Sequence, residues 1–372
     1  MPARRPRLAT VPSSTSHTKL PRWPATFRVG RRTIGEGCAP FLIAELSANH
    51  KQRFEEAVAL IDAAAAAGAD AVKLQTYTPD TITLPARTAP FRVGKGLWEG
   101  RYLYDLYGEA MTPWEWHADL ARHARSRGLI CFSTPFDESA VDFLEREMRP
   151  PVYKIASFEV NHIPLLRRVG ATRKPVIMST GMATEAEISL AVRTLHKAGC
   201  PALVLLKCVS AYPSQPRDFN LRSLTALRDT LLAPAGLSDH TMTEEVALGS
   251  VALGGCVIEK HFTIDRATGG VDSGFSLEPA EFARMAQAVR ALHASLGRPI
   301  LGPTRQDLKQ RRFRRSIFVA RDVARGAVLT TANLRIVRPA DGLDPARWNE
   351  VLGRRARRAL KAGTPLKPGD WS

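Results

Sequence analysis

Two histidines close consecutive apolar segments of the chain: His240 ends AGLSDH and His261 lies in GCVIEKHF. If these segments are neighbouring parallel strands about 4.8 Å apart, both imidazoles can reach one divalent metal with bonds of about 2.1 Å. Two protein ligands leave coordination positions for water and substrate, which is what a catalytic metal needs, and Asp239 is placed to order the nearby shell. The alternative for either histidine is a hydrogen-bonded position in the core.

Two lysines also lie inside apolar segments, Lys73 in AVKLQT and Lys154 in VYKIAS. A lysine inside a buried strand must point into a pocket or find a partner, because an unpaired ammonium is rarely buried. Two such lysines predict an anionic ligand. A Schiff-base role is a rival interpretation, since lysines with a lowered pKa form imines with carbonyl substrates. Structural pairing with Glu45 or Glu159 is the third alternative.

Hydroxyl and carboxyl groups stand at similar positions along the chain. The hydroxyls of Thr134, Ser157, Ser179 and Ser210 follow apolar segments and are suited to donate to a phosphate or carboxylate. The carboxyl groups of Glu45 (AELSANH), Glu159 (KIASFE) and Asp272 (GGVDS) are candidates for general base work or for binding the polar groups of a sugar. Placement on the surface is the alternative for Asp272.

The apolar segments that carry these residues recur eight times at the spacing of βα units. They are FLIAEL, AVKLQT, LICFST, VYKIAS, PVIMST, LVLLKCVS, AGLSDH and GCVIEKHF. Eight parallel strands alternating with helices make a (β/α)₈ TIM barrel, whose active site lies at the carboxyl ends of the strands. The pattern therefore predicts an α/β fold and the place of its site together.

Helical signals separate the strands. Residues 52–67 carry apolar residues at helical spacing, and 184–198 opens with Thr184 and Glu187 as a capping box before Gly199. Further helices are expected at 114–127, 138–148, 161–170, 218–232, 243–254 and 279–295.

One connection is much longer than the others. It runs from Tyr77 to Pro113 and groups Trp98, Tyr102, Tyr104 and Tyr107. Long loops in compact domains are usually functional, and this one follows the second strand on the active-site side. We expect it to cover the substrate, with a plug at the barrel rim or a subunit contact as the alternative.

Composition and length bound the protein class. The chain has 372 residues, 44% of them hydrophobic, and no apolar run near the roughly 20 residues of a membrane span. We therefore expect a soluble protein without a membrane partner. The start of the chain is basic but has no apolar signal-peptide core, and five cysteines without CxxC pairing indicate free thiols, so the cytoplasm is the expected location.

The net charge of +17 is concentrated at the two ends of the chain. Residues 1–35 carry +8 and residues 297–372 carry +12, while residues 36–296 carry −3. This distribution favours a solvated basic surface or attraction of an anionic substrate, and no nucleic-acid partner is expected. Four regions follow: a basic tail, expected to be disordered, at 1–26; the barrel at 27–297; a linker without apolar periodicity at 298–312; and a small β-rich module at 313–372.

Taken together, these segments resemble the sialic acid synthase family, and most closely its pseudaminic acid synthase branch. The matching stretches run from about Phe27 to Gly297 and include AELSANH, AGADAVKLQTYTPDT, LYDLYGEAMTPWEW, CFSTPFDESA, GLSDHT and VIEKHFT. The module after Phe313 is similar to the SAF (antifreeze-like) domain that ends these synthases. The resemblance implies a transferase that condenses phosphoenolpyruvate with a 2,4-diacetamido-2,4,6-trideoxy sugar aldehyde.

The resemblance also assigns roles to residues. It implies that phosphoenolpyruvate is held by Lys73, Gln75, Thr134, Lys154, Ser157, Ser179 and Ser238. His240 and His261 would bind Mn²⁺, with Mg²⁺ or Co²⁺ as alternatives, and Glu45, Glu159 and Asp272 would handle protons and position the sugar beside Tyr212. In this family the SAF domain of a homodimer reaches the partner barrel and contributes an arginine. Arg338 in RPADG is the matching residue, although Ala340 and Asp341 depart from the usual loop.

Three other functions are weighed against this one. The first is a legionaminate or N-acetylneuraminate synthase with a different amino-sugar acceptor. The second is a Schiff-base aldolase that uses one of the lysines. The third is a sugar- or ice-binding protein in which only the SAF module is functional.

Overall fold

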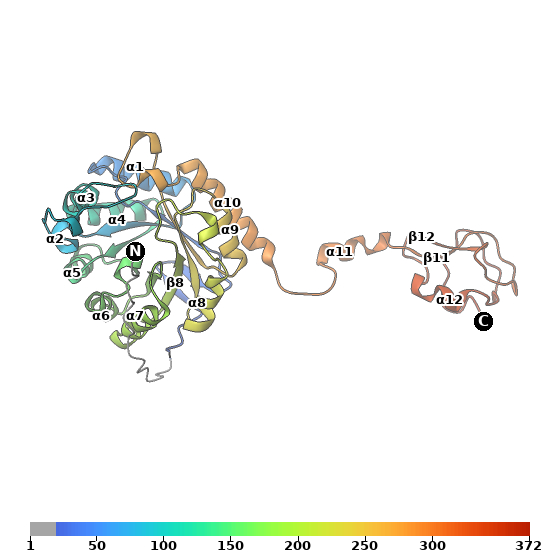
Figure 1. The fold of residues 1–372 in the computed structure, drawn as a ribbon. Coiled ribbons are helices and arrows are strands. Elements are labelled where there is room, and N and C mark those ends of the chain that lie inside the picture. The colour runs from blue at the N-terminus through green and yellow to red at the C-terminus, as the bar shows by residue number, and fades with distance from the viewer. Residues whose placement is uncertain (1–19) are drawn as a thin grey trace, which may run out of the picture. The chain divides into compact units, whose positions relative to one another are not determined.

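The computed structural model describes residues 20–372, which divide into two compact units, one ending at Gly297 and the other spanning Arg298–Ser372. In the first unit, eight parallel strands close into a barrel that is surrounded by helices (Figure 1). This confirms the predicted fold class. The barrel strands are β3 (Phe41–Glu45), β4 (Ala71–Thr76), β5 (Ile130–Pro135), β6 (Tyr153–Ile155), β7 (Val176–Ser179), β8 (Leu203–Cys208), β9 (Ala235–Asp239) and β10 (Val257–His261).

The principal helices follow the strands in the order expected for a barrel. They are α1 (Phe54–Ala66), α4 (His117–Ser126), α5 (Glu138–Glu147), α6 (Ile163–Ala171), α7 (Glu185–Ala198), α8 (Ser223–Leu231), α9 (Glu245–Ala252) and α10 (Pro279–Leu296). The predicted capping box of α7 is confirmed: the Thr184 hydroxyl accepts from Glu187 N, the Glu187 carboxylate accepts from Thr184 N, and Gly199 ends the helix with φ +106°.

The inward faces of the strands form two layers. Near the start of the strands they are apolar and form one buried cluster that includes Phe41, Ile43, Phe132, Ile177 and Leu206. A hairpin of β1 (Thr26–Val29) and β2 (Arg32–Gly35) adds Val29 and Ile34 to that cluster, so it closes this end of the barrel. Further along the strands the inward positions become polar, and these polar groups line a cavity at the carboxyl ends.

The segment between β4 and α4 contains helices that the sequence pattern did not predict. It holds α2 (Pro79–Ile82) and α3 (Leu103–Ala110), which interrupt the expected loop. Leu103, Leu106, Tyr107 and Ala110 are spaced along one face of α3, and this amphipathic spacing explains the helix. The helical period of these residues, rather than their aromatic character, is the sequence signal that indicates α3.

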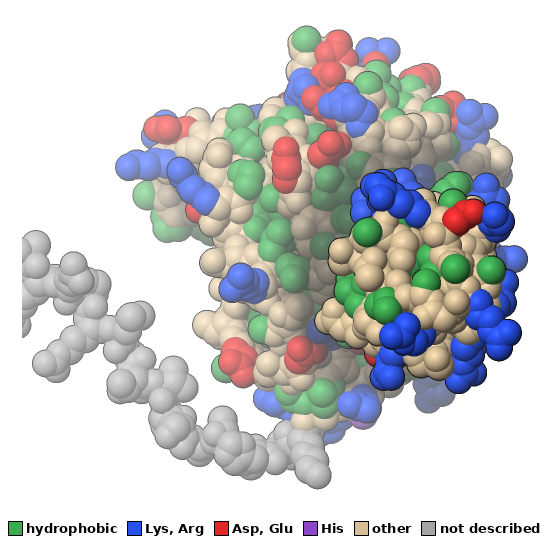
Figure 2. Space-filling view, turned by 90° about the vertical axis from the view of Figure 1, so that its right-hand side faces the viewer, with side chains coloured by type: hydrophobic (Ala, Val, Ile, Leu, Met, Phe, Trp, Pro, Cys, Tyr) green, Lys and Arg blue, Asp and Glu red, His purple; other side chains and the backbone are tan. Residues whose placement is uncertain are grey.

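The second unit is small and strongly basic. It contains α11 (Arg305–Gln310), the antiparallel pair β11 (Ser316–Val319) and β12 (Leu334–Val337), and α12 (Trp348–Val351), around a core that includes Ile317, Leu334 and Leu366. The segment 298–312, predicted as an irregular linker, includes the exposed helix α11, which Thr304 and Asp307 cap reciprocally. Figure 2 shows many lysine and arginine side chains on the face of this unit that points toward the viewer.

Two sequence predictions about the ends and surface of the chain can be compared with the structure. No helix among residues 20–372 is long and apolar enough to cross a membrane. The predicted disordered tail, residues 1–26, falls largely on residues 1–19, which lie outside the described part. For residues 20–26 the prediction is wrong, because Trp23 is buried against the barrel helices, donates its backbone N–H to Leu232 O at 3.0 Å and packs edge-on against His196.

We therefore expect Trp23→Ala to lower the free energy of unfolding by about 3 kcal/mol, because it removes a buried aromatic side chain and leaves a cavity. Urea titration followed by circular dichroism measures the change. Leu190→Ala, at an exposed leucine on α7, is the matched control and should change the value by less than about 0.5 kcal/mol. Equal effects of the two substitutions would contradict the packing role of Trp23.

Candidate active site

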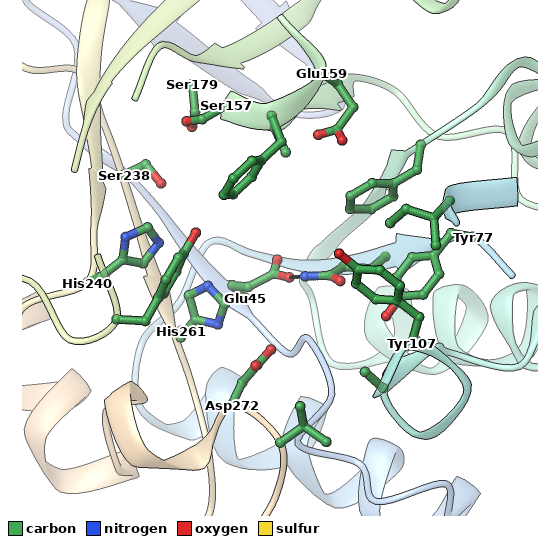
Figure 3. A pocket seen from close by; sticks show the side chains of 18 of the residues that line it. Glu45, Tyr77, Tyr107, Ser157, Glu159, Ser179, Ser238, His240, His261 and Asp272 are labelled. Carbon is green, nitrogen blue, oxygen red and sulfur yellow. Dashed lines mark hydrogen bonds between the residues drawn. The ribbon is translucent and has the colours of Figure 1, made fainter. Parts of the chain in front are cut away.

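The polar layer of the barrel opens into a cavity of about 450 Å³ at the carboxyl ends of the strands (Figure 3). Most of the sequence-predicted site residues line it. These are Glu45, Lys73, Gln75, Lys154, Ser157, Glu159, Ser179, Tyr212, Ser238, His240, His261 and Asp272. Thr134 lies behind the cavity wall and Ser210 beside it, while Arg338 belongs to the second unit, whose position relative to the barrel is not determined.

Four charged side chains form a buried network at the base of the cavity. The Lys73 ammonium lies 2.5 Å from a Glu45 oxygen and 3.6 Å from Glu259, and Lys154 lies 3.6 Å from the same Glu259 oxygen. Each side chain is almost inaccessible to solvent. Glu259 therefore links the two lysines that we predicted to bind an anion.

The pKa values of this network follow from burial and from its opposite charges. Burial raises the pKa of Glu45 to about 7 although Lys73 opposes the shift. Burial also favours the neutral forms of Lys73 and Glu259, but their partners outweigh it, so the pKa of Lys73 is raised and that of Glu259 is lowered. For Lys154 burial prevails and lowers the pKa, with Glu259 opposing the shift. Glu45 can therefore exchange a proton near neutral pH.

Hydroxyl groups complete the surroundings of the two lysines. Lys73 donates to Thr134 Oγ1 at 3.0 Å, and Lys154 donates to Ser179 Oγ at 2.7 Å. Ser157 accepts from Gly181 N at 3.0 Å. A Cβ at Gly181 would lie 2.3 Å from Ser210 Oγ, so only glycine lets this loop approach the two serines so closely. Ammonium and hydroxyl donors that converge in this way suit a phosphate or carboxylate ligand.

The two predicted metal ligands lie side by side. The ring centroids of His240 and His261 are 5.3 Å apart. His240 donates its Nδ1–H to Val209 O at 2.8 Å, which leaves the lone pair on Nε2, and Nδ1 of His261 is buried without a hydrogen-bond partner. A backbone carbonyl that fixes the tautomer is typical of metal-binding histidines, so the pair fits a divalent cation. Residues 20–372 contain no group of three or more His, Cys, Asp or Glu side chains arranged to hold a metal.

The prediction that Asp239 orders the surroundings of these histidines is wrong. Asp239 forms a buried ion pair with Lys260 at 2.9 Å, and Lys260 also donates to the carbonyls of Thr241 and Thr243. The reason is alternation along the strand: Asp239 and Lys260 point away from the cavity when their neighbours His240 and His261 point into it. The ion pair joins β9 and β10 directly behind the two imidazoles.

The remaining carboxyl groups lie at opposite sides of the opening (Figure 3). Asp272 is half-buried rather than on the surface and accepts a hydrogen bond from Ser47, to which Gln75 also donates at 2.9 Å. Glu159 has one buried oxygen without a partner, and burial raises its pKa to about 7 against the opposing charge of Lys154. Both acids can therefore contact a ligand between them.

Three further cavity residues were missed at the sequence level, Cys208, Glu259 and Phe275, and so was Ser47, which donates to Asp272. Glu259 lies two residues before His261, so strand alternation alone could have placed it on the same inward face. Phe275 packs edge-on against His261, with ring centroids 4.8 Å apart, and ends a short 3-10 helix whose position local sequence does not indicate. Among the grouped aromatic residues, Trp98 and Tyr107 line the cavity, whereas Tyr102 and Tyr104 do not.

The sequence matches the NeuB family over residues 60–300 and the SAF domain over residues 314–370. The chain belongs to the NeuB family. Its C-terminal unit contains the SAF domain, as the resemblance implied.

Curated proteins give a graded similarity to this NeuB-family chain. It is 43% identical over 331 residues to the pseudaminic acid synthase of Campylobacter jejuni (strain NCTC 11168), which covers 89% of this chain and 96% of the relative. The Helicobacter pylori pseudaminic acid synthase is 41% identical, with coverages of 89% and 97%. The N,N'-diacetyllegionaminic acid synthase of Legionella pneumophila is 34% identical, with coverages of 91% and 96%.

Solved structures agree with the NeuB-family fold. A sialic acid synthetase from Leptospira borgpetersenii superimposes with a TM-score of 0.69 at 30% identity and covers 78% of this chain and 96% of its own. The spore coat polysaccharide biosynthesis protein SpsE of Bacillus subtilis gives 0.64 at 32% identity, with coverages of 93% and 99%.

Glu259 lies 3.6 Å from both Lys73 and Lys154, and this placement predicts how anion binding depends on pH. In Glu259→Gln the carboxylate that favours protonated Lys154 is lost, so the lysine pKa falls further. We expect affinity for sulfate, a non-titrating anion, to decline at a lower pH in the variant than in the wild type, as measured by calorimetry across alkaline pH values. Glu147→Gln, at an exposed site on α5, is the control. An unchanged midpoint in Glu259→Gln would show that the network does not set the lysine charge.

Proposed function

We propose that this protein is a pseudaminic acid synthase. It condenses phosphoenolpyruvate with 2,4-diacetamido-2,4,6-trideoxy-L-altrose and water to give pseudaminate and phosphate. The observation that carries the proposal is the 41–43% identity to pseudaminic acid synthases over 89% of the chain, against 33–34% to legionaminic acid synthases. The cavity supports it, because an anion-binding half and a carboxyl-lined opening match the two substrates.

The anionic substrate binds at the lysine end of the cavity. Lys73 and Lys154 face the phosphate and carboxylate of phosphoenolpyruvate, assisted by Gln75, Thr134, Ser157, Ser179, Ser210 and Ser238. The anion competes with Glu45 and Glu259 for the ammonium groups, and the proton that Glu45 can take up near pH 7 reduces this competition. These donors fix the phosphate and the carboxylate, and they thereby position the enol carbons between them. The apolar layer near the start of the strands excludes water from that end of the barrel.

His240 and His261 hold a divalent cation, Mn²⁺ in the first place and otherwise Mg²⁺ or Co²⁺. When bound, such a cation supplies Lewis-acid polarisation of the sugar aldehyde. The rings of Tyr212 and Phe275 pack against the histidines, with centroids 4.4 Å from His240 and 4.8 Å from His261 respectively, and these contacts hold the two imidazoles in place and exclude bulk water.

The carboxyl groups donate and accept the protons of the reaction. C3 of phosphoenolpyruvate forms a bond to the aldehyde carbon, the aldehyde oxygen takes a proton, and the cationic C2 takes up water, which loses a proton. The tetrahedral adduct then releases phosphate by C–O cleavage. Glu45 and Glu159 have pKa values near 7, so each can donate or accept a proton at neutral pH, and Asp272 positions the sugar.

The SAF domain contributes to the site of a partner subunit in this proposal. The protein is a homodimer in which Arg338 reaches the partner barrel and neutralises substrate charge. The excess of basic residues in the C-terminal unit supports this role, because a positive surface attracts an anionic substrate.

A mass-spectrometric assay with a panel of acceptors tests the function. Purified protein with Mn²⁺ and phosphoenolpyruvate should form a nine-carbon acid and phosphate from the diacetamido trideoxy altrose sugar, in preference to N-acetylmannosamine or other 2,4-diacetamido analogues. Product from N-acetylmannosamine alone would contradict the assignment. A lysine adduct trapped by borohydride in the presence of substrate would instead favour the Schiff-base aldolase.

The metal role of the histidines has a readout that does not depend on turnover. Calorimetry should show Mn²⁺ binding to chelator-treated wild-type protein, weakened by about tenfold or more in His240→Ala and His261→Ala, since each removes a ligand. Both variants should lose activity and keep the circular dichroism spectrum. His293→Ala, on α10 away from the cavity, is the control. Unchanged Mn²⁺ affinity in both cavity variants would exclude this metal site.

A further inference from the structure

The half of the cavity that faces away from the histidines is apolar. In Figure 3 Tyr77 and Tyr107 lie on the opposite side of Glu45 from His240 and His261. Around these tyrosines the cavity is lined by a set of aliphatic side chains from the segment between β4 and α4. We call this set the apolar wall; it consists of Ile82, Val93, Leu103, Leu106 and Ala110.

The apolar wall lies outside the three hydrophobic clusters of the described chain, although Leu106 and Ala110 are buried. None of its members belongs to the three buried clusters of residues 20–372. Val93 and Leu103 keep part of their surface exposed while they line the cavity. Burial in the barrel core therefore does not account for the apolar character of Val93 and Leu103, and a ligand that covers these two side chains would remove their exposed surface from water.

The segment that carries the apolar wall is attached to the barrel at several points. Trp114 Nε1 donates to Tyr77 O at 3.1 Å, which ties the two ends of the segment together. In its middle, Trp98 Nε1 donates to Val271 O at 2.9 Å, next to Asp272. The backbone of Val93 is held by two hydrogen bonds, from its N–H to Arg101 O and from Gly100 N–H to its carbonyl. The wall is thus a preformed surface.

The geometry points to the apolar wall as the surface that selects the acceptor sugar. We infer that it takes up methyl groups at the end of the acceptor remote from the aldehyde, and so favours a deoxygenated, N-acylated sugar over a polyhydroxylated one. The inference rests on the proposed function: with the aldehyde at the histidines and phosphoenolpyruvate at the lysines, the rest of the sugar extends toward the wall.

The chemistry of the wall explains the direction of the selection. An acetamido methyl or a terminal C6 methyl gains from contact with aliphatic side chains, whereas a hydroxyl packed against the same side chains loses water and gains no hydrogen bond from them. Apolar pockets of this kind discriminate between such substituents by about 10- to 100-fold. Glu45, Gln75 and Glu159 line the same cavity and remain available to the polar groups of the same sugar.

The test changes the polarity of the wall and compares two acceptors. Val93→Thr keeps the side-chain shape and Leu103→Asn keeps nearly the same size, and both sites are partly exposed, so the double variant should fold with an unchanged melting temperature. We measure kcat/KM for the diacetamido trideoxy sugar and for N-acetylmannosamine, together with KM for phosphoenolpyruvate. Leu84→Asn, at an exposed leucine of the same segment that does not line the cavity, is the matched control.

We expect kcat/KM for the diacetamido trideoxy sugar to fall by about tenfold or more in the double variant, with a smaller loss or a gain for N-acetylmannosamine and an unchanged KM for phosphoenolpyruvate. An equal change for both acceptors, or an effect as large in Leu84→Asn, would overturn the inference while leaving the proposed function intact. A wild-type protein that prefers N-acetylmannosamine would also overturn it. A wild-type protein that condenses neither sugar would refute the proposed function, and the inference with it.

Discussion

The shared ion pair of Glu259 with Lys73 and Lys154 is the interaction on which the site depends. A buried charge costs several kcal/mol unless it is paired, and here two ammonium groups are kept inside a barrel by carboxylates from β3 and β10. The four residues come from β3, β4, β6 and β10, so only the closed barrel brings them together. The apolar layer and the β1–β2 hairpin close the other end, so an anion reaches the lysines from the carboxyl ends of the strands.

Because side chains alternate along a strand, the two faces of β9 and β10 have different roles. His240 and His261 face the cavity, while their neighbours Asp239 and Lys260 form a buried ion pair behind them. This pair fixes the relative position of the two strands and so the 5.3 Å separation of the imidazoles. The same barrel thus holds an anion-binding half, a histidine pair and an apolar wall at one opening, each contributed by a different part of the fold.

Much of this arrangement could be predicted from local sequence. The eight strands, the capping box of Thr184 and Glu187, and the cavity positions of most predicted site residues follow from periodicity and from residues that end apolar segments. The pairing of Glu259 with both lysines could not be predicted in this way, because it depends on the closure of the barrel between β10 and β3. The packing of Trp23 and the position of Phe275 also depend on contacts between segments far apart in the chain.

A crystal structure of the full chain with phosphoenolpyruvate and Mn²⁺ tests the central claim most directly. The account predicts phosphate or carboxylate oxygens within hydrogen-bond distance of Nζ of both Lys73 and Lys154, with the cation on His240 and His261. Phosphoenolpyruvate bound elsewhere, with both lysines still paired only to Glu45 and Glu259, would contradict it.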